Sequence, residues 1–213
     1  MNGILGRKIG MTQVYTAEGV LVPVTVIQAG PCTVVATRQP ERDGYAAVQL
    51  GFDPVKPSRV NKAMAGQFKK AGTGPFRVLR EFALAGDELP AVGAECTVGE
   101  LFQPGEIVSV QGVTKGRGTA GVMKRHRFSG FPASHGTHEY FRHGGSIGNR
   151  SYPGRVFKGK RMSGRYGAEN VTTTHLKVIA VRPEENLILI RGAVPGARNG
   201  TVMVLKDKGA TRS

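Results

Sequence analysis

The chain has 213 residues and a formal net charge of +15, from 30 Lys and Arg against 15 Asp and Glu. This length suits one domain, or one domain with an appendage. Cys32 and Cys96 are 64 residues apart in the sequence and form no CxxC pair, so a disulfide framework or zinc ribbon has no support, and a reduced cytoplasmic compartment is favoured. No apolar run approaches the roughly 18–20 residues of a membrane span, and the amino terminus lacks a signal-peptide pattern. We therefore expect no membrane partner.

The first fifty residues are predicted to form short β-strands. Residues 20–27 are nearly all β-branched or aliphatic, as in a strand covered on both faces. Pro23 cannot donate a ladder hydrogen bond, so one edge there should be free or bulged. Strands are also predicted over residues 32–37 and 45–50, with a turn at residues 42–44 between them.

Residues 54–100 are predicted to form a small α+β insertion. A helix over residues 61–71 would place Met64 and Phe68 on one face, with Asn61 as its N-cap. Residues 76–82 have the pattern of a strand.

The carboxy-terminal half again contains short strands, over residues 106–111, 176–181, 187–190 and 202–205. Residues 183–186 would join two of them in a hairpin. Many short strands with Gly and Pro turns favour a closed β-barrel over a helical bundle. The fold prediction is therefore mainly β. It comprises a barrel domain (residues 1–53, 101–127 and 166–213), the α+β insertion, and a long irregular basic loop extension (residues 128–165).

Positive charge is concentrated in residues 114–165. This segment holds twelve Lys and Arg and one acid, Glu139, together with eleven glycines and four of the five histidines. It shows no apolar periodicity, so it cannot bury a core of its own. Strands flank it on both sides, which disfavours a solvated tail. The natural counter-surface for so much cationic charge is a nucleic acid.

Two motifs in this segment resemble catalytic or cofactor signatures. Residues 116–121 match GxGxxG, but a dinucleotide fold needs an acid about twenty residues on, at the end of a second strand. Glu139 lies in no strand pattern. Residues 144–148 match the GxSxG elbow around Ser146, but Pro153 and Gly154 oppose the helix that should follow. Both motifs are better interpreted as glycine-rich backbone that phosphates can approach closely because glycine has no side chain.

Histidines and aromatic residues complete the pattern. The spacing of His135, His138 and His143 fits no metal site, and we expect neither a metal nor a cofactor. Imidazoles and aromatic rings among arginines can stack on bases. No DNA-binding motif is present, so RNA is favoured. The predicted RNA-binding residues are Lys115, Arg117, Lys124, Arg125, Arg127, His135, His138, Arg142, His143, Arg150, Arg155, Lys158, Lys160, Arg161 and Arg165.

Four ordered segments resemble a known family. Residues 114–125 (TKGRGTAGVMKR) are similar to the signature of the large-subunit ribosomal protein L-three family. Residues 6–12, 153–164 and 192–196 agree with the same family, so the resemblance spans essentially the whole chain, at a length similar to the bacterial members.

The resemblance implies a six-stranded barrel like that of translation-factor domains, in a structural constituent of the large ribosomal subunit that is not an enzyme. It implies direct binding near the 3′ end of the large-subunit rRNA early in assembly, where the protein nucleates the subunit. Neighbours would be the L-fourteen and L-nineteen proteins, with no DNA partner. It also implies a loop (residues 128–165, tip near residues 144–153) that extends towards the peptidyl-transferase centre.

Two other functions stay open at this point. A barrel-type module for single-stranded nucleic acid, or a translation factor, would bind through its barrel and tolerate loss of residues 130–160. A hydrolase would depend on Ser146 as its nucleophile.

Overall fold

The computed structural model describes residues 1–84 and 89–207. Parts of the predicted insertion and barrel ranges, residues 85–88 and 208–213, lie outside the described residues. The chain divides into two compact units. The first contains residues 1–113 and 170–213, and the second contains residues 114–169.

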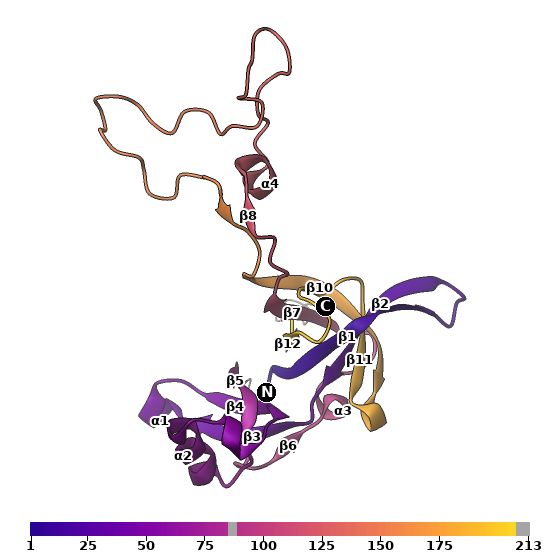
Figure 1. The fold of residues 1–213 in the computed structure, drawn as a ribbon. Helices are drawn as coiled ribbons and strands as arrows, with labels where there is room; N and C mark the ends of the chain where they lie inside the picture. The colour runs from indigo at the N-terminus through magenta and orange to yellow at the C-terminus, as the bar shows by residue number, and fades with distance from the viewer. Residues whose placement is uncertain (85–88, 208–213) are drawn as a thin grey trace. The chain divides into compact units, whose positions relative to one another are not determined.

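Six antiparallel strands close a β-barrel in the first unit, which confirms the predicted fold class (Figure 1). Short turns join β1 to β2 and β10 to β11, as antiparallel neighbours allow, whereas β2 is connected to β7 by residues 30–106 and β7 to β10 by residues 114–169. The short 3₁₀ helix η2 (Pro183–Glu185) joins two neighbouring strands and confirms the predicted hairpin. In order around the barrel, the strands are β1 (Gly3–Tyr15), β12 (Thr201–Lys206), β7 (Ile107–Val113), β10 (Asn170–Arg182), β11 (Leu187–Arg191) and β2 (Leu21–Ala29).

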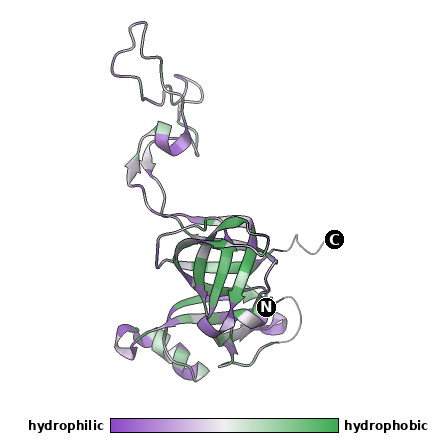
Figure 2. Ribbon diagram, turned by 90° about the vertical axis from the view of Figure 1, so that its right-hand side faces the viewer, coloured by the Kyte–Doolittle hydropathy of each residue, from purple (hydrophilic) through white to green (hydrophobic). Residues whose placement is uncertain are grey.

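Aliphatic side chains at alternating strand positions fill the barrel. Val108 and Val110 of β7, and Ile188 and Ile190 of β11, have no exposed surface, as expected for residues that alternate between the inside and outside of a closed sheet. Figure 2 shows these strands coloured as hydrophobic. Pairing of β2 with β11 stops at Val24, next to Pro23, which has no N–H to offer.

A second antiparallel sheet has the strand order β5 (Phe76–Ala83), β4 (Ala47–Pro54), β3 (Cys32–Arg38) and β6 (Glu95–Cys96). The sequence placed β3 and β4 in the barrel, whereas the structure pairs them with each other in this sheet. The reason is that an apolar strand has the same side-chain pattern in either sheet, so the pattern does not identify its pairing partner. The connection between them is the single turn α1 (Pro40–Asp43), which ends at Gly44 with φ 82°.

The helix α2 (Lys62–Ala71) confirms the predicted helix and its cap. The Asn61 side chain accepts a hydrogen bond from the Met64 backbone N–H at 2.8 Å. Phe68 is buried, and its ring meets Phe76 edge-to-face at 6.1 Å. The 3₁₀ helix η1 (Pro57–Arg59) precedes α2, and the single turn α3 (Val98–Leu101) follows β6. No helix within residues 1–84 and 89–207 has the length and hydropathy needed to cross a membrane.

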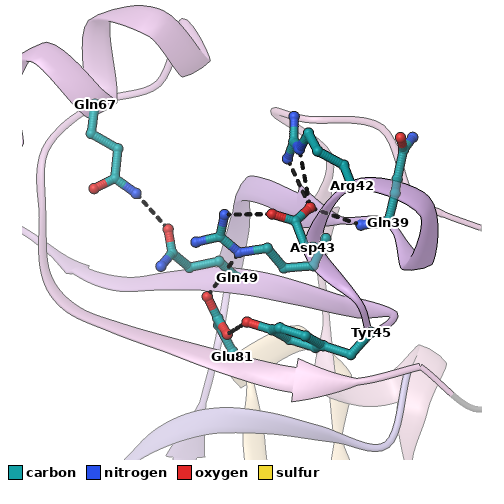
Figure 3. A network of polar contacts seen from close by, with 8 residues as sticks. Gln39, Arg42, Asp43, Tyr45, Gln49, Gln67 and Glu81 are labelled. Atoms are coloured by element: carbon teal, nitrogen blue, oxygen red, sulfur yellow. Dashed lines mark hydrogen bonds and ion pairs between the residues drawn. The ribbon is translucent and has the colours of Figure 1, made fainter.

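Charged side chains on the second sheet are paired with one another (Figure 3). Arg38 bridges Asp43 at 3.5 Å and Glu81 at 3.1 Å, and Glu81 also accepts a hydrogen bond from the Tyr45 hydroxyl at 2.8 Å. Arg42 binds Asp43 at 3.0 Å. Acids thus neutralise these arginines locally.

The second unit has little regular structure. It contains two-residue strands β8 (Thr119–Ala120) and β9 (Gly164–Arg165) and the short helix α4 (Val122–His126). Residues 119–120 pair as a strand with β9, and the helix begins after Gly121. Residues 127–163 contain no helix or strand.

Candidate nucleic-acid interface

The two ends of the basic segment are held together by a short backbone ladder. Beyond the β8–β9 pair, the Arg117 N–H donates to the Tyr166 carbonyl at 2.8 Å and the Tyr166 N–H donates to the Gly118 carbonyl at 3.0 Å. The Thr114 N–H donates to the Glu169 carbonyl at 2.9 Å. The residues between these two ends therefore form a loop that the ladder closes at its base.

The chain comes back to α4 midway through this loop. A Cβ on Gly144 would lie 3.5 Å from both Cγ atoms of Val122, and the Phe131 N–H donates to the Phe141 carbonyl at 3.1 Å. Residues 130–141 and 145–161 therefore form two separate excursions (Figure 1). The family resemblance placed Gly144 near the tip of one long loop, whereas the structure places its backbone beside Val122 of α4, at a distance where a Cβ would make ordinary van der Waals contact.

Arginines of the segment are oriented by aromatic rings and carbonyl groups. The Arg117 guanidinium lies 4.9 Å above the centre of the Tyr166 ring, and the Arg155 guanidinium lies 6.0 Å from the centre of Phe157. Arg125 donates from Nη1 to the Met162 carbonyl at 2.9 Å. Each contact uses one face or one donor of a group with five N–H donors, so the remaining donors stay available.

All fifteen predicted site residues lie in the second unit. Fourteen are exposed, and Arg125 is half-buried. The predicted set is Lys115, Arg117, Lys124, Arg125, Arg127, His135, His138, Arg142, His143, Arg150, Arg155, Lys158, Lys160, Arg161 and Arg165. The fold brings their charges together along a segment of little more than fifty residues without burying them.

Among the described residues, none of the twelve Lys and Arg in residues 114–165 forms an ion pair with a carboxylate. The ion pairs of the structure join residues within 1–113 and 170–207. Like charges at such density repel one another, and an added polyanion relieves that repulsion.

The histidines and Ser146 do not form catalytic or metal-binding arrangements within the described ranges. His143 contacts the Tyr140 ring edge-on at 4.9 Å. No three His, Cys, Asp or Glu side chains in residues 1–84 and 89–207 gather in a way that could hold a metal ion. The Ser146 hydroxyl donates to the Gly148 carbonyl at 2.9 Å, and the hydrogen bonds of these residues give it no His or carboxylate partner.

Sequence reasoning missed two residues of the candidate interface. His126 places Nε2 3.1 Å from the Met162 carbonyl, and Tyr166 supports Arg117 from one residue beyond the predicted segment. His126 could have been found because it stands between Arg125 and Arg127. Tyr166 could not, since its role depends on pairing across the ladder.

Comparison with known proteins identifies the family. The family model described as "Ribosomal protein L3" matches residues 69–187. The "Large ribosomal subunit protein uL3" of Acidothermus cellulolyticus is 54% identical over 96% of this chain and 91% of its own length. The proteins of the same name from Brachyspira pilosicoli and Syntrophobacter fumaroxidans are 50% and 47% identical, over 96% and 99% of this chain and 93% and 99% of their own lengths. The chain therefore belongs to the ribosomal protein L3 family, the uL3 proteins, which are structural components of the large ribosomal subunit and not enzymes.

Proposed function

We propose that this protein binds large-subunit rRNA directly through residues 114–165, and that residues 128–165 penetrate between rRNA helices. The observation that carries the proposal is the set of twelve Lys and Arg side chains without a carboxylate partner among the described residues. The phosphates of folded RNA supply the counter-charge that the protein itself does not.

Arginine geometry suggests which side chains bind phosphate most directly. The planar guanidinium can contact two phosphate oxygens at once, which an ammonium group cannot do. We propose this role for Arg117, Arg125, Arg127, Arg150 and Arg155. The stacking of Arg117 on Tyr166 favours it, because the ring supports one face and leaves the donor edge free.

Counterion release should dominate the binding free energy. Each phosphate neutralised by Lys or Arg releases condensed cations, so affinity falls steeply as salt rises. If the protein makes six to ten such contacts, its affinity for RNA should fall by a factor of about 10³–10⁵ when salt rises from about 50 to 200 mM.

Family membership supports a finer proposal for the place of the protein in the subunit. Its relatives are named as large-subunit proteins. We propose binding near the 3′ end of the large-subunit rRNA, nucleation of subunit assembly, contacts with the L-fourteen and L-nineteen families, and a loop that extends towards the peptidyl-transferase centre. DNA is not a partner in this proposal.

Excision of the loop tests the proposal. A variant in which a short Gly-Ser linker replaces residues 130–160 should be lost from large subunits, measured by quantitative mass spectrometry of purified particles. The control replaces residues 16–19, the turn between β1 and β2, with a linker of the same composition, and should be incorporated normally. Undiminished incorporation of the excised variant would contradict the proposal and favour a module that binds nucleic acid through its barrel.

A further inference from the structure

A second concentration of positive charge lies on a folded part of the first unit. Residues 54–80 contain seven Lys and Arg and no acid, and all seven side chains are exposed. Acids elsewhere in residues 1–113 nearly balance this charge, so the net charge of residues 1–113 as a whole conceals it. The seven residues are Lys56, Arg59, Lys62, Lys69, Lys70, Arg77 and Arg80.

The helix α2 presents three of these lysines on its solvent-facing side. Phe68 is buried and Met64, one turn before it, is half-buried on the inner side of the helix. Lys62 and Lys69 are seven residues apart, so they differ by only about 20° around the helix axis. Gly66 lies between them, and a Cβ there would meet nothing within 4 Å. The result is a bare length of helix backbone flanked by lysines.

Arg59 and Arg77 add charge beside the helix. They line a groove of about 450 Å³ together with Asn61 and Phe76. Asp53 is 3.7 Å from Arg77, but it is already bound by Arg7 at 2.6 Å. Within the described part of the chain, Lys56, Arg59 and the three lysines of α2 form no ion pair with an acid.

Arg80 does not belong to this surface. Arg80 lines a hollow with Val78 of the same strand and with Leu5 and Met203 of the barrel, whereas Arg77 lines the groove beside α2. The Glu81 partner on β4 is Gln49, which accepts a hydrogen bond from Gln67 of α2 at 2.6 Å (Figure 3). The helix therefore lies over the side of the sheet that Gln49 faces, next to the groove that Arg77 lines. We call Lys56, Arg59, Lys62, Lys69, Lys70 and Arg77 the α2 surface.

We infer that the α2 surface is a second, preformed rRNA-binding site that contacts the phosphates of a duplex RNA segment. This inference rests on the proposed rRNA function but uses a different part of the fold. The helix, its cap and its packing on the sheet exist without RNA, so this site loses less conformational entropy on binding than residues 128–165 do.

The chemistry of the α2 surface favours RNA over an acidic protein. Protein interfaces depend on a few exposed apolar or aromatic anchors, and no large hydrophobic side chain in residues 54–80 is among the exposed ones. Phosphate binding needs only cations and accessible backbone. Duplex RNA is recognised mainly through its backbone, which suits a convex helix with spaced lysines.

A pair of matched variants tests the inference. The first carries Lys62→Gln, Lys69→Gln and Lys70→Gln. The control carries Arg80→Gln, Lys177→Gln and Arg191→Gln, which removes the same charge from exposed positions outside the α2 surface. Thermal denaturation should show that both remain folded. Binding of the full-length proteins to purified large-subunit rRNA is then measured by filter binding over a range of KCl concentrations, with excess tRNA as competitor.

The α2 variant should bind about 10- to 100-fold more weakly at low salt, and its salt-dependence slope should fall by about 2–3. The control variant should lose much less affinity, and its salt-dependence slope should fall much less. Equal losses in the two variants would overturn the inference. Normal rRNA binding together with poor incorporation into subunits would also overturn it, and would indicate a protein partner instead.

A third variant separates this inference from the proposed function. Arg117→Gln, Arg125→Gln and Arg127→Gln are introduced alone and together with the α2 changes. Two independent sites should give losses that multiply. If only the α2 changes weaken binding, the role proposed for residues 114–165 fails while the second site stands. If only the substitutions of Arg117, Arg125 and Arg127 weaken rRNA binding, the inference that the α2 surface is a second site is wrong.

Discussion

Arginine has two distinct environments in this protein. In the second sheet, Arg38 and Arg42 are held by Asp43 and Glu81, and their charge is neutralised inside the fold (Figure 3). In residues 114–165, Arg117 and Arg155 lie over aromatic rings and Arg125 donates to a carbonyl group, and none of the three has a carboxylate partner in the described structure. The first environment contributes to stability, and the second keeps charge available for a ligand.

Asp43 should make the stability of the second sheet depend on pH. The Gln39 backbone N–H, and then Arg42 and Arg38, hold the pKa of the Asp43 carboxyl below its usual value of 3.8. A lowered pKa in the folded state means that the contribution is present above the unfolded pKa and is lost as pH falls through the folded pKa. Asp43→Asn should therefore lower Tm at pH 7, and the difference from the parent protein should shrink as pH falls below 3.8.

Glu41 provides the control for this prediction. It lies on α1 beside Asp43 but takes part in none of these hydrogen bonds or ion pairs. Glu41→Gln should leave the pH profile of Tm unchanged. A difference in Tm between Asp43→Asn and the parent protein that did not shrink as pH fell below 3.8 would show that the variant acts through packing and not through charge.

At the scale of elements, the loop depends on the ladder at its base. β8 and β9 contribute two residue pairs, and three further backbone hydrogen bonds extend the pairing from Thr114 to Glu169. Gly167 is essential to this geometry. Its φ is 75°, and a Cβ there would collide with the Lys115 carbonyl oxygen.

Gly167→Ala should open the ladder. Hydrogen exchange at the Arg117 and Tyr166 amides, measured by NMR, should accelerate by at least about tenfold. This corresponds to a decrease of about 1.4 kcal/mol in the free energy of opening the ladder. Gly118→Ala is the matched control, because Gly118 lies in the same ladder with a φ of 68° but has nothing within 4 Å of its Cβ position. Equal acceleration in both variants would assign the effect to backbone strain alone.

At the scale of the whole molecule, one unit has a hydrophobic core and the other has almost none. Ala120 and Val122 are the only hydrophobic residues of the second unit classed as buried among those described, whereas the first unit buries residues from every barrel strand. Apolar burial of this small extent cannot offset the conformational entropy of fifty residues.

The free protein should therefore contain a folded first unit and a disordered loop. In a ¹H–¹⁵N NMR spectrum without RNA, amides of residues 130–160 should cluster at random-coil shifts, while those of β7 and β11 should be dispersed. Addition of large-subunit rRNA fragments should broaden or shift the loop resonances. Dispersed, exchange-protected amides across residues 130–160 in the free protein would contradict this expectation.

The sequence alone determined the properties that depend on local pattern. Strand positions such as residues 187–190, the cap at Asn61 and the charge of residues 114–165 follow from side-chain type and spacing, so they could be predicted. The positive charge of residues 54–80 was equally visible, but averaging over residues 1–113 concealed it.

Only the tertiary structure decided which elements pair. β3 and β4 could have joined either sheet, because an apolar strand has the same alternation in both. Gly144 lies beside Val122, Tyr166 supports Arg117, and Arg80 and Arg77 line different hollows, although each of these relations involves residues whose own sequence patterns give no sign of it. Charge and propensity are properties of short segments, whereas the choice among pairing partners depends on which long-range arrangement buries the most apolar surface.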